Sequence, residues 1–320
     1  MSNAFFLDLS RLAATHPRLI DRGIGLDRAP AAGWLALQAA ALWPTWRWMA
    51  ERMQDGSDDP LGLLAIAALL AVAWTHRKSL RPSPSLGWLA LAAVASVAAT
   101  VATTGVGALP PAMPLAAALL AVAAMGCGLL AFLPRSVAAA PVIGLAVLAL
   151  PLLSSLQFYA GYPLRVLTAE ASRWLLAPAF EVTRQGHTLL VDGRLIIVDA
   201  PCSGVQMAWF GYFTACVVAL WLQRSGRSFA ARLPAVGMLV LTGNVLRNSL
   251  LVAFEGAGHP ASPWLHDAIG LVLLALVCVG IAKAMGLGGS PREASSALTG
   301  CAAWADPARG RLPAGRGVRS

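Results

Sequence analysis

Charged residues are scarce in this sequence. Only 12% of the 320 residues are charged, whereas 58% are hydrophobic. A typical soluble domain is about 25% charged, so the composition excludes an ordinary water-soluble enzyme. Acidic residues are the scarcer sign, with 15 against 24 lysines and arginines, which leaves a net charge of +9. Such a surplus is typical of a nucleic-acid partner or of a membrane topology signal, and the positions of the charges decide between the two.

Cysteine is also scarce, with five residues in the chain. Their positions, 127, 202, 216, 278 and 301, form neither a CxxC pair nor a Cys/His ligand spacing. This pattern excludes a zinc module and a disulfide framework. Nothing in the sequence indicates a metal or an organic cofactor.

The two ends of the chain lack long apolar runs. Residues 1–32 carry four arginines but no continuous apolar core with a small-residue cleavage site, so we interpret them as a cytoplasmic N-terminal lead-in rather than a signal peptide. Residues 288–320 are rich in Gly, Ala, Pro and Arg and have no helical or strand period. We expect this basic tail to be disordered and cytoplasmic.

Apolar runs of roughly 20 residues occupy most of the chain between these ends, and a helix of that length crosses a hydrocarbon core of about 30 Å. We therefore predict an all-α polytopic membrane protein with about eight transmembrane helices in one domain, residues 33–287. The predicted spans are Gly33–Ala50, Leu61–Thr75, Leu86–Thr104, Leu115–Leu133, Val137–Phe158, Val205–Leu222, Leu233–Phe254 and Trp264–Leu287.

Three short loops between the predicted spans are basic and contain no acidic residue: 76–85, 134–136 and 223–232. By the positive-inside rule these loops are cytoplasmic. With eight spans, alternation then places both termini in the cytoplasm as well. The charge surplus is therefore interpreted as a topology signal, and no nucleic-acid partner is expected.

The largest segment on the opposite side is 160–204. Two runs rich in leucine and β-branched residues within 187–198 are separated by Asp192-Gly193, which predicts a β-hairpin because the favoured tight turn needs positive φ at both central residues. Upstream, 164–179 has apolar residues at helical spacing and is predicted to form a helix that lies along the membrane surface or packs over the bundle.

Cys202 ends this external segment, directly before the sixth predicted span. The positive end of the helix dipole favours a thiolate there, and a thiolate is the reactive form of cysteine. A lone cysteine at a span end is also typical of a small packing residue. Cys127, Cys216 and Cys278 lie inside apolar spans and are interpreted as buried packing residues.

The seventh predicted span contains Arg247, with Asn244 and Asn248 at offsets of three and four residues and so on one helical stripe. An arginine within an apolar span costs about 2.5–3.5 kcal/mol on insertion scales, so it is expected to face a polar cavity or a partner. Two interpretations stay open: a functional cation supported by the two asparagines, or an arginine that either snorkels to the membrane surface or pairs with an acid to hold helices together.

His266 and Asp267 lie at the external start of the eighth predicted span. A helix N-terminus favours the neutral imidazole, which can act as a base, and Asp267 opposes that effect. The predicted topology places Cys202, Arg247 and His266, from three different helices, near the same face. A nucleophile, a base and a fixed positive charge are what thiol-dependent acyl transfer needs.

These residues resemble the exosortase/archaeosortase family of membrane cysteine transpeptidases. The resemblance rests on Cys202-Ser203-Gly204 after an extended external segment, on Asn244-Val-Leu-Arg247-Asn248 in the next span, and on His266 followed four residues later by Gly270. It covers roughly residues 137–287. The family's catalytic cysteine, arginine and histidine map onto Cys202, Arg247 and His266.

The resemblance implies an enzyme of the bacterial inner membrane with its active site on the periplasmic side. Such an enzyme cleaves C-terminal sorting signals of exported proteins, of the PEP-CTERM type, which carry a short motif, a hydrophobic helix and a basic end. Two other functions stay open from the residues alone. One is a transporter or flippase component in which Arg247 serves an anionic solute, and the other is an intramembrane protease whose nucleophile is Ser203.

Overall fold

The computed structural model describes residues 31–54, 60–104, 114–198, 203–259 and 262–287. Cys202 and Cys301 lie outside these residues, as do nearly all of the predicted N-terminal lead-in and the whole of the predicted tail. The predictions made for those segments stay predictions.

Each of the eight predicted spans coincides with helical structure, but eight membrane crossings are not confirmed. Within the described residues, four helices are long and apolar enough to cross a membrane: α6 (Leu86–Thr104), α7 (Pro114–Phe132), α11 (Gly226–Gly256) and α12 (Pro263–Gly286). A bent pair of helices, α8 (Ala139–Leu148) and α9 (Leu153–Leu176), makes a fifth crossing if it counts as one span. Three further apolar helices are shorter: α3 (Ala31–Ala41), α5 (Gly62–Thr75) and α10 (Val205–Trp221).

Two of the predicted single spans are broken in the structure, each beside a proline. The first is divided at Leu42 into α3 and α4 (Trp43–Gln54), next to Pro44. The fifth is divided into α8 and α9, which meet at 93° around Pro151. Proline lacks the N–H that would continue the helical ladder and disfavours helical dihedrals in the residue before it. The predicted helix 164–179 corresponds to the second half of α9, but it ends at Leu176 and is continuous with the end of the fifth predicted span.

The chain divides into two compact units, residues 1–51 with 70–134 and residues 52–69 with 135–320. In the first unit, α3, α6 and α7 pack through Leu42, Ala99, Ala121 and Ala124. The side-chain amide of Gln38 donates hydrogen bonds to the Ser96 hydroxyl at 3.1 Å and to the Ala124 carbonyl at 2.9 Å.

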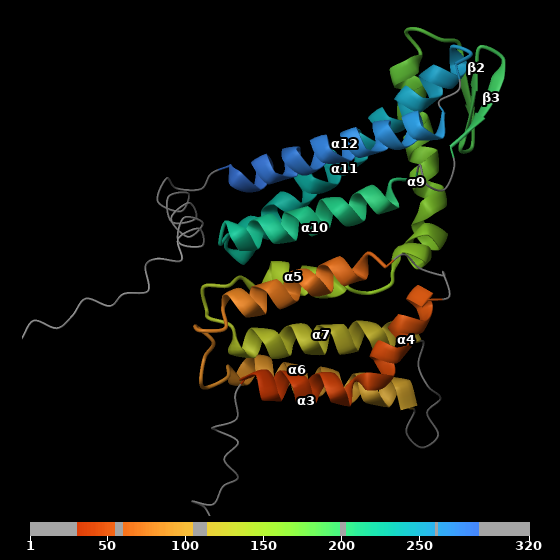
Figure 1. The fold of residues 1–320 in the computed structure, drawn as a ribbon. Coiled ribbons are helices and arrows are strands. Elements are labelled where there is room, and N and C mark those ends of the chain that lie inside the picture. The colour runs from red at the N-terminus through yellow and green to blue at the C-terminus, as the bar shows by residue number, and fades with distance from the viewer. Residues whose placement is uncertain (1–30, 55–59, 105–113, 199–202, 260–261, 288–320) are drawn as a thin grey trace, which may run out of the picture. The chain divides into compact units, whose positions relative to one another are not determined.

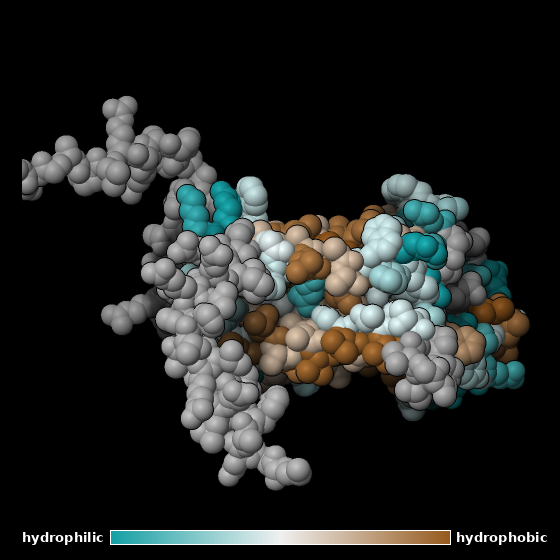
Figure 2. Space-filling view, turned by 90° about the horizontal axis from the view of Figure 1, so that it is seen from below, coloured by the Kyte–Doolittle hydropathy of each residue, from teal (hydrophilic) through white to brown (hydrophobic). Residues whose placement is uncertain are grey.

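In the second unit, α10, α11 and α12 run side by side, and α9 runs across them next to the sheet (Figure 1). Their packing is close because glycines lie where helices meet. A Cβ atom on Gly211 would lie 2.5 Å from Val240, and one on Gly243 would meet Val277. Beyond this contact the three helices share an apolar cluster that includes Cys216 and Ile281. On the face seen from below Figure 1, hydrophobic residues are interspersed with near-neutral ones (Figure 2).

The predicted hairpin is confirmed. Strands β2 (Thr188–Val191) and β3 (Arg194–Ile197) pair antiparallel, and the turn residues Asp192 and Gly193 have φ of 46° and 81°. A third strand, β1 (Val182–Gln185), pairs with β2 and was not predicted from the sequence. The sheet packs on α9 and on the last turns of α11 through an apolar cluster formed by Ala169, Leu176, Leu189, Val191, Ile196, Val198 and Val252.

Arg224, in the loop between α10 and α11, and Arg232, in the second turn of α11, bind the C-terminal end of α12. Arg224 donates to the Gly286 carbonyl at 2.6 Å, and Arg232 donates to the carbonyls of Ala284 and Leu287 at 3.1 and 2.5 Å. A helix leaves its last carbonyls without partners and carries partial negative charge at that end. The two arginines therefore cap α12, and they fix the basic end of the three-helix packing.

Candidate functional site

The turn that leads into α10 is held from two sides. Gly204, the N-cap of α10, has a φ of 84°, which an L-amino acid adopts only at a cost. Ser203 is 2% exposed; its hydroxyl donates to Gln157 of α9 at 3.0 Å and accepts a hydrogen bond from the Val205 N–H. Ser203 thus ties the start of α10 to α9. Cys202, one residue earlier, lies outside the described residues.

Asn244 and Asn248 bond α11 to α9. The Asn244 amide donates to the Thr168 hydroxyl at 3.1 Å, and the Asn248 amide donates to the Ser172 hydroxyl at 2.9 Å. All four side chains are at most 3% exposed. The equal offset of four residues on both helices produces two parallel hydrogen bonds. Gln157, Thr168 and Ser172 were not predicted from the sequence; small polar residues at helical spacing in α9 are the signal that could have identified the last two.

Arg247 packs against α12 at Gly270. A Cβ atom on Gly270 would lie 3.2 Å from Arg247 Nε and 3.5 Å from Cζ. The guanidinium therefore rests on the backbone of α12, in space that a side chain at position 270 would take. Gly270 thus acquires a physical role in the positioning of Arg247.

An open groove of about 340 Å³ lies between α10, α11 and α12. Its polar lining consists of Gln206, Arg247 and Asp267, each from a different helix. Asp267 was predicted as a supporting residue and Gln206 was not. The apolar lining consists of Met207, Phe210, Leu271 and Leu274, with Gly270 beside Arg247. The three helices thus bring the predicted arginine and the start of α12 to one surface.

His266 lies in the first turns of α12, whose N-cap Ser262 accepts a hydrogen bond from the Leu265 N–H. The His266 side chain is 35% exposed, and His266 Nδ1 lies 3.3 Å from Asp267 Oδ1. An offset of four residues puts His266 and Gly270 on the same side of α12. Among the described residues, His, Cys, Asp and Glu form no group of three that could hold a metal ion.

The three cysteines predicted to be packing residues lie inside helices. Cys127 and Cys216 are buried and Cys278 is half-buried. A Cβ atom on Gly144 of α8 would lie 2.7 Å from the Cys216 sulfur, so Cys216 fills a close contact between α8 and α10. Thr214 donates a hydrogen bond to the Cys278 sulfur at 3.4 Å.

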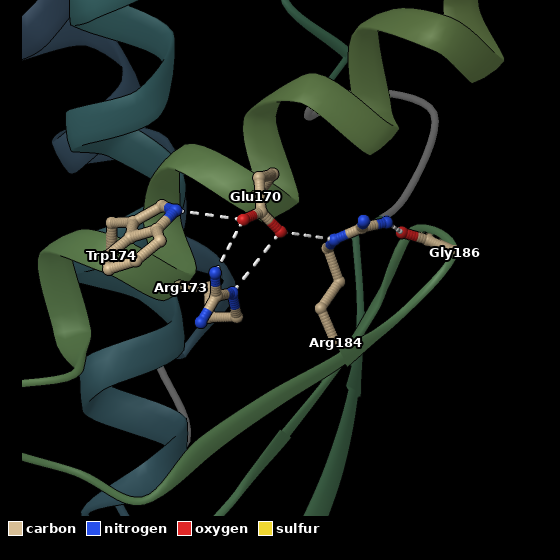
Figure 3. Close-up of polar contacts among 5 residues, drawn as sticks. All are labelled: Glu170, Arg173, Trp174, Arg184 and Gly186. Atoms are coloured by element: carbon tan, nitrogen blue, oxygen red, sulfur yellow. Dashed lines mark hydrogen bonds and ion pairs between the residues drawn. The ribbon is translucent and has the colours of Figure 1, made fainter.

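A charged cluster joins α9 to the sheet (Figure 3). Glu170 accepts hydrogen bonds from Arg173 at 2.6 Å, from Arg184 of β1 at 2.6 Å and from the Trp174 indole at 2.9 Å. These donors, the Arg173 guanidinium first, lower the pKa of Glu170 from 4.5 to about 2. Arg184 also donates to the Gly186 carbonyl at 2.7 Å. The cluster holds β1 against α9 at the same turns of α9 from which Thr168 and Ser172 bond to α11.

Most of the chain matches the sequence profile of a known protein family. The sequence profile of the transmembrane exosortases matches residues 48–282. No curated protein and no solved structure matches the sequence.

Proposed function

The chain belongs to the transmembrane exosortase family, and on this premise we propose that it is a cysteine peptidase and transpeptidase that cleaves C-terminal sorting signals of exported proteins. Family membership makes it a membrane protein with a role in protein sorting. The reaction, the three catalytic residues and the location at the periplasmic face of the inner membrane are our proposal.

The groove between α10, α11 and α12 is the observation that carries this proposal. Arg247 lines it together with residues from the first two turns of α10, which follows Cys202, and of α12. His266 comes one residue before the lining residue Asp267 and is not itself part of the lining. Three segments far apart in the sequence therefore converge where a peptide could contact all three helices. Two helix N-termini at one groove also favour the negative charge that develops during acyl transfer.

In the proposed reaction, the Cys202 thiolate attacks the carbonyl carbon of the scissile peptide bond after His266 accepts the thiol proton. Arg247 stabilises the resulting oxyanion or orients an acidic motif. When the C–N bond breaks, His266 returns the proton to the leaving amine, and the sulfur keeps the acyl group as a thioester. An amine or water then attacks the thioester, forms an amide or a carboxylic acid, and releases the thiol. No cofactor takes part.

The environment of Ser203 supports Cys202, rather than Ser203, as the nucleophile. The Ser203 hydroxyl is 2% exposed, donates to Gln157 and accepts from the α10 N-terminus. A hydroxyl that attacked substrate would have to give up both contacts. These contacts favour a structural role for Ser203.

The packing between α10, α11 and α12 supports an enzyme over a transporter. Away from the groove the three helices are packed through a dense apolar cluster that includes Ala215, Val236 and Met285, each buried. An anionic solute passing from the groove along these helices would meet this apolar core, where unpaired charge costs several kcal/mol.

The depth of Arg247 agrees with a site at a membrane surface. Arg247 lies level with Gly270 of α12, and Arg224 binds the other end of that helix at Gly286. At 1.5 Å per residue these two glycines are about 24 Å apart. A hydrocarbon core of roughly 30 Å then ends about 6 Å beyond Arg247. Because basic loops mark the cytoplasmic side, we assign the groove to the periplasmic side and both termini to the cytoplasm.

The test is cleavage of a co-expressed exported reporter that ends in an acidic motif, an apolar helix and a basic segment. We expect Cys202→Ala, Arg247→Ala and His266→Ala to abolish removal of this tail. Cys278→Ala and His259→Ala are the matched controls and should cleave normally, since Cys278 lies inside α12 and His259 lies in the loop before it. Normal cleavage by all three site variants at wild-type protein levels would refute the assignment. Normal cleavage by Cys202→Ala alone would favour Ser203 as the nucleophile.

A further inference from the structure

The lining of the groove changes character along its length. Both α10 and α12 begin at the groove's polar end and run toward the end of the three-helix packing that Arg224 and Arg232 cap. Residues with higher numbers on either helix therefore lie farther into the membrane. Gln206 and Asp267 come first, followed by Arg247 over Gly270, and then by Phe210 and Leu274. The groove is therefore polar at its outer end and apolar toward the membrane interior.

Its dimensions fit a short stretch of polypeptide. Asp267 and Leu274 are about 10 Å apart along α12 at 1.5 Å per residue, which equals about three residues of extended chain. The wall formed by Leu271 is open to the lipid-facing surface, because that side chain is 67% exposed. A ligand anchored in the bilayer can thus enter sideways without passing through water.

We propose that this groove binds the junction at which a polar, acidic stretch of substrate passes into its apolar membrane anchor. The substrate carboxylate or carbonyls bond to Arg247, and the first apolar side chains of the anchor occupy the part of the groove between Phe210 and Leu274. This inference rests on the proposed function and extends it, since it makes Met207, Phe210 and Leu274 the residues that set which side chains are accepted after the scissile segment.

The rim of the groove favours a peptide over a phospholipid. Asp267 is 79% exposed at the outer end, and its carboxylate can accept hydrogen bonds from the N–H groups of a peptide, which a phosphate group does not have. The amide of Gln206, on the facing wall, offers both a donor and an acceptor to a peptide backbone. Arg247 and the N-terminus of α10 attract an acidic side chain of the substrate peptide.

Site-specific photo-crosslinking tests where the reporter binds. A photoreactive residue replaces Leu271 in the groove or Leu276 on the lipid-exposed side of α12, where Leu276 is 60% exposed. We expect crosslinks to the reporter's anchor from position 271 at a yield about tenfold above that from position 276, the order of discrimination that one apolar pocket provides. Equal yields from the two positions would overturn the proposal, and so would a phospholipid adduct at 271 that the reporter does not displace.

Filling the groove gives a second measurement. Leu274→Trp should lower cleavage of a reporter with large apolar residues at the junction by about tenfold or more, whereas Leu276→Trp should cleave normally. Alanines at the junction of the reporter should restore cleavage by Leu274→Trp, which a misfolded variant would not show. Normal cleavage of the bulky reporter by Leu274→Trp, or loss that the alanine reporter does not relieve, would count against the groove.

The two proposals fail in different ways. If the wild type does not cut the reporter but position 271 crosslinks to it in preference to position 276, the groove stands and the proposed reaction falls. If the wild type cuts the reporter while the crosslinks and the Leu274→Trp variant show no preference, the reaction stands and the groove assignment falls.

Discussion

The side-chain amide of Asn244 lies against the backbone of Gly204. A Cβ atom on Gly204 would lie 2.8 Å from Asn244 Cγ and 2.9 Å from Nδ2, which is closer than nonbonded atoms approach. The same amide donates to Thr168 of α9. One buried asparagine on α11 thus contacts both the turn that leads into α10 and the helix that crosses it, and so it helps to hold the turn that follows Cys202.

Replacement of Gly204 by alanine should damage both folding and cleavage. The left-handed conformation costs an L-residue about 1–2 kcal/mol, and the new methyl group must also displace Asn244. We expect Gly204→Ala to lower the midpoint of thermal unfolding in detergent micelles and to reduce reporter cleavage strongly.

Gly193→Ala is the control for the cost of the left-handed backbone conformation alone. Gly193 has a φ of 81°, close to that of Gly204, but a Cβ atom there meets nothing within 4 Å. It should therefore lose only the stability that the left-handed conformation costs and keep its cleavage activity. Equal losses in the two variants would show that contact with Asn244 contributes nothing.

The hydrogen bond between Asn244 and Thr168 should appear as coupling in a double-mutant cycle. Buried interhelical hydrogen bonds in membrane proteins contribute about 0.6 kcal/mol on average and up to about 1.7 kcal/mol. We expect a coupling in this range from Asn244→Leu, Thr168→Val and the double variant, measured by reversible unfolding in micelles. The pair Asn248 and Ser172 has the same geometry and should give a similar value. Strictly additive effects in both cycles would contradict the assignment of these contacts.

Gly270→Ala should impair catalysis more than stability. Its Cβ atom would lie 3.2 Å from Arg247 Nε, so the guanidinium must shift by a few tenths of an ångström. A displacement of about 1 Å in a catalytic group can cost about a hundredfold in rate, so this smaller shift should lower cleavage severalfold, measured as reporter processing per inserted enzyme. Gly280→Ala on the same helix is the control, because its Cβ atom meets Leu239 at an ordinary 3.6 Å. Equal processing by both variants would argue against the role assigned to Gly270.

The sequence predicted the elements that local patterns define. Apolar runs located the helices, and Asp192-Gly193 located the hairpin, because each signal is complete within a few neighbouring residues. It did not predict how many helices are long enough to cross a membrane, since hydropathy shows only that a run is apolar and not that the helix is continuous. The interruptions near Pro44 and Pro151 could have been anticipated from the prolines. Strand β1 was not predicted because Val182–Gln185 is short and largely polar.

Of the predicted site residues, Arg247 and Asp267 line the groove. Both were noticeable in the sequence because a charge within or beside an apolar span is rare. The helical spacing of Thr168 and Ser172 was a signal that was not used. The sequence could not identify Gln206, whose relevance depends on which helices lie side by side. Gly270 was named only as part of the family resemblance, four residues after His266, and its contact with Arg247 supplies a physical reason for a glycine there. The approach of Asn244 to Gly204 joins residues forty positions apart and follows only from the packing of α10 on α11.

The Glu170 cluster predicts how stability depends on pH. Hydrogen bonds from Arg173, Arg184 and Trp174 lower the pKa of Glu170 to about 2, below its ordinary 4.5. Above about pH 4.5 the carboxylate is charged in the folded and the unfolded chain, so the stabilisation is fully present. As pH falls from 4.5 toward 2, the unfolded chain takes up the proton first and this stabilisation is lost. The wild type should therefore exceed Glu170→Gln in unfolding midpoint at pH 7, and the difference should shrink below pH 4.5, measured by thermal unfolding in micelles across this range. Parallel pH profiles for the two proteins would show that Glu170 does not hold β1 to α9 through its charge.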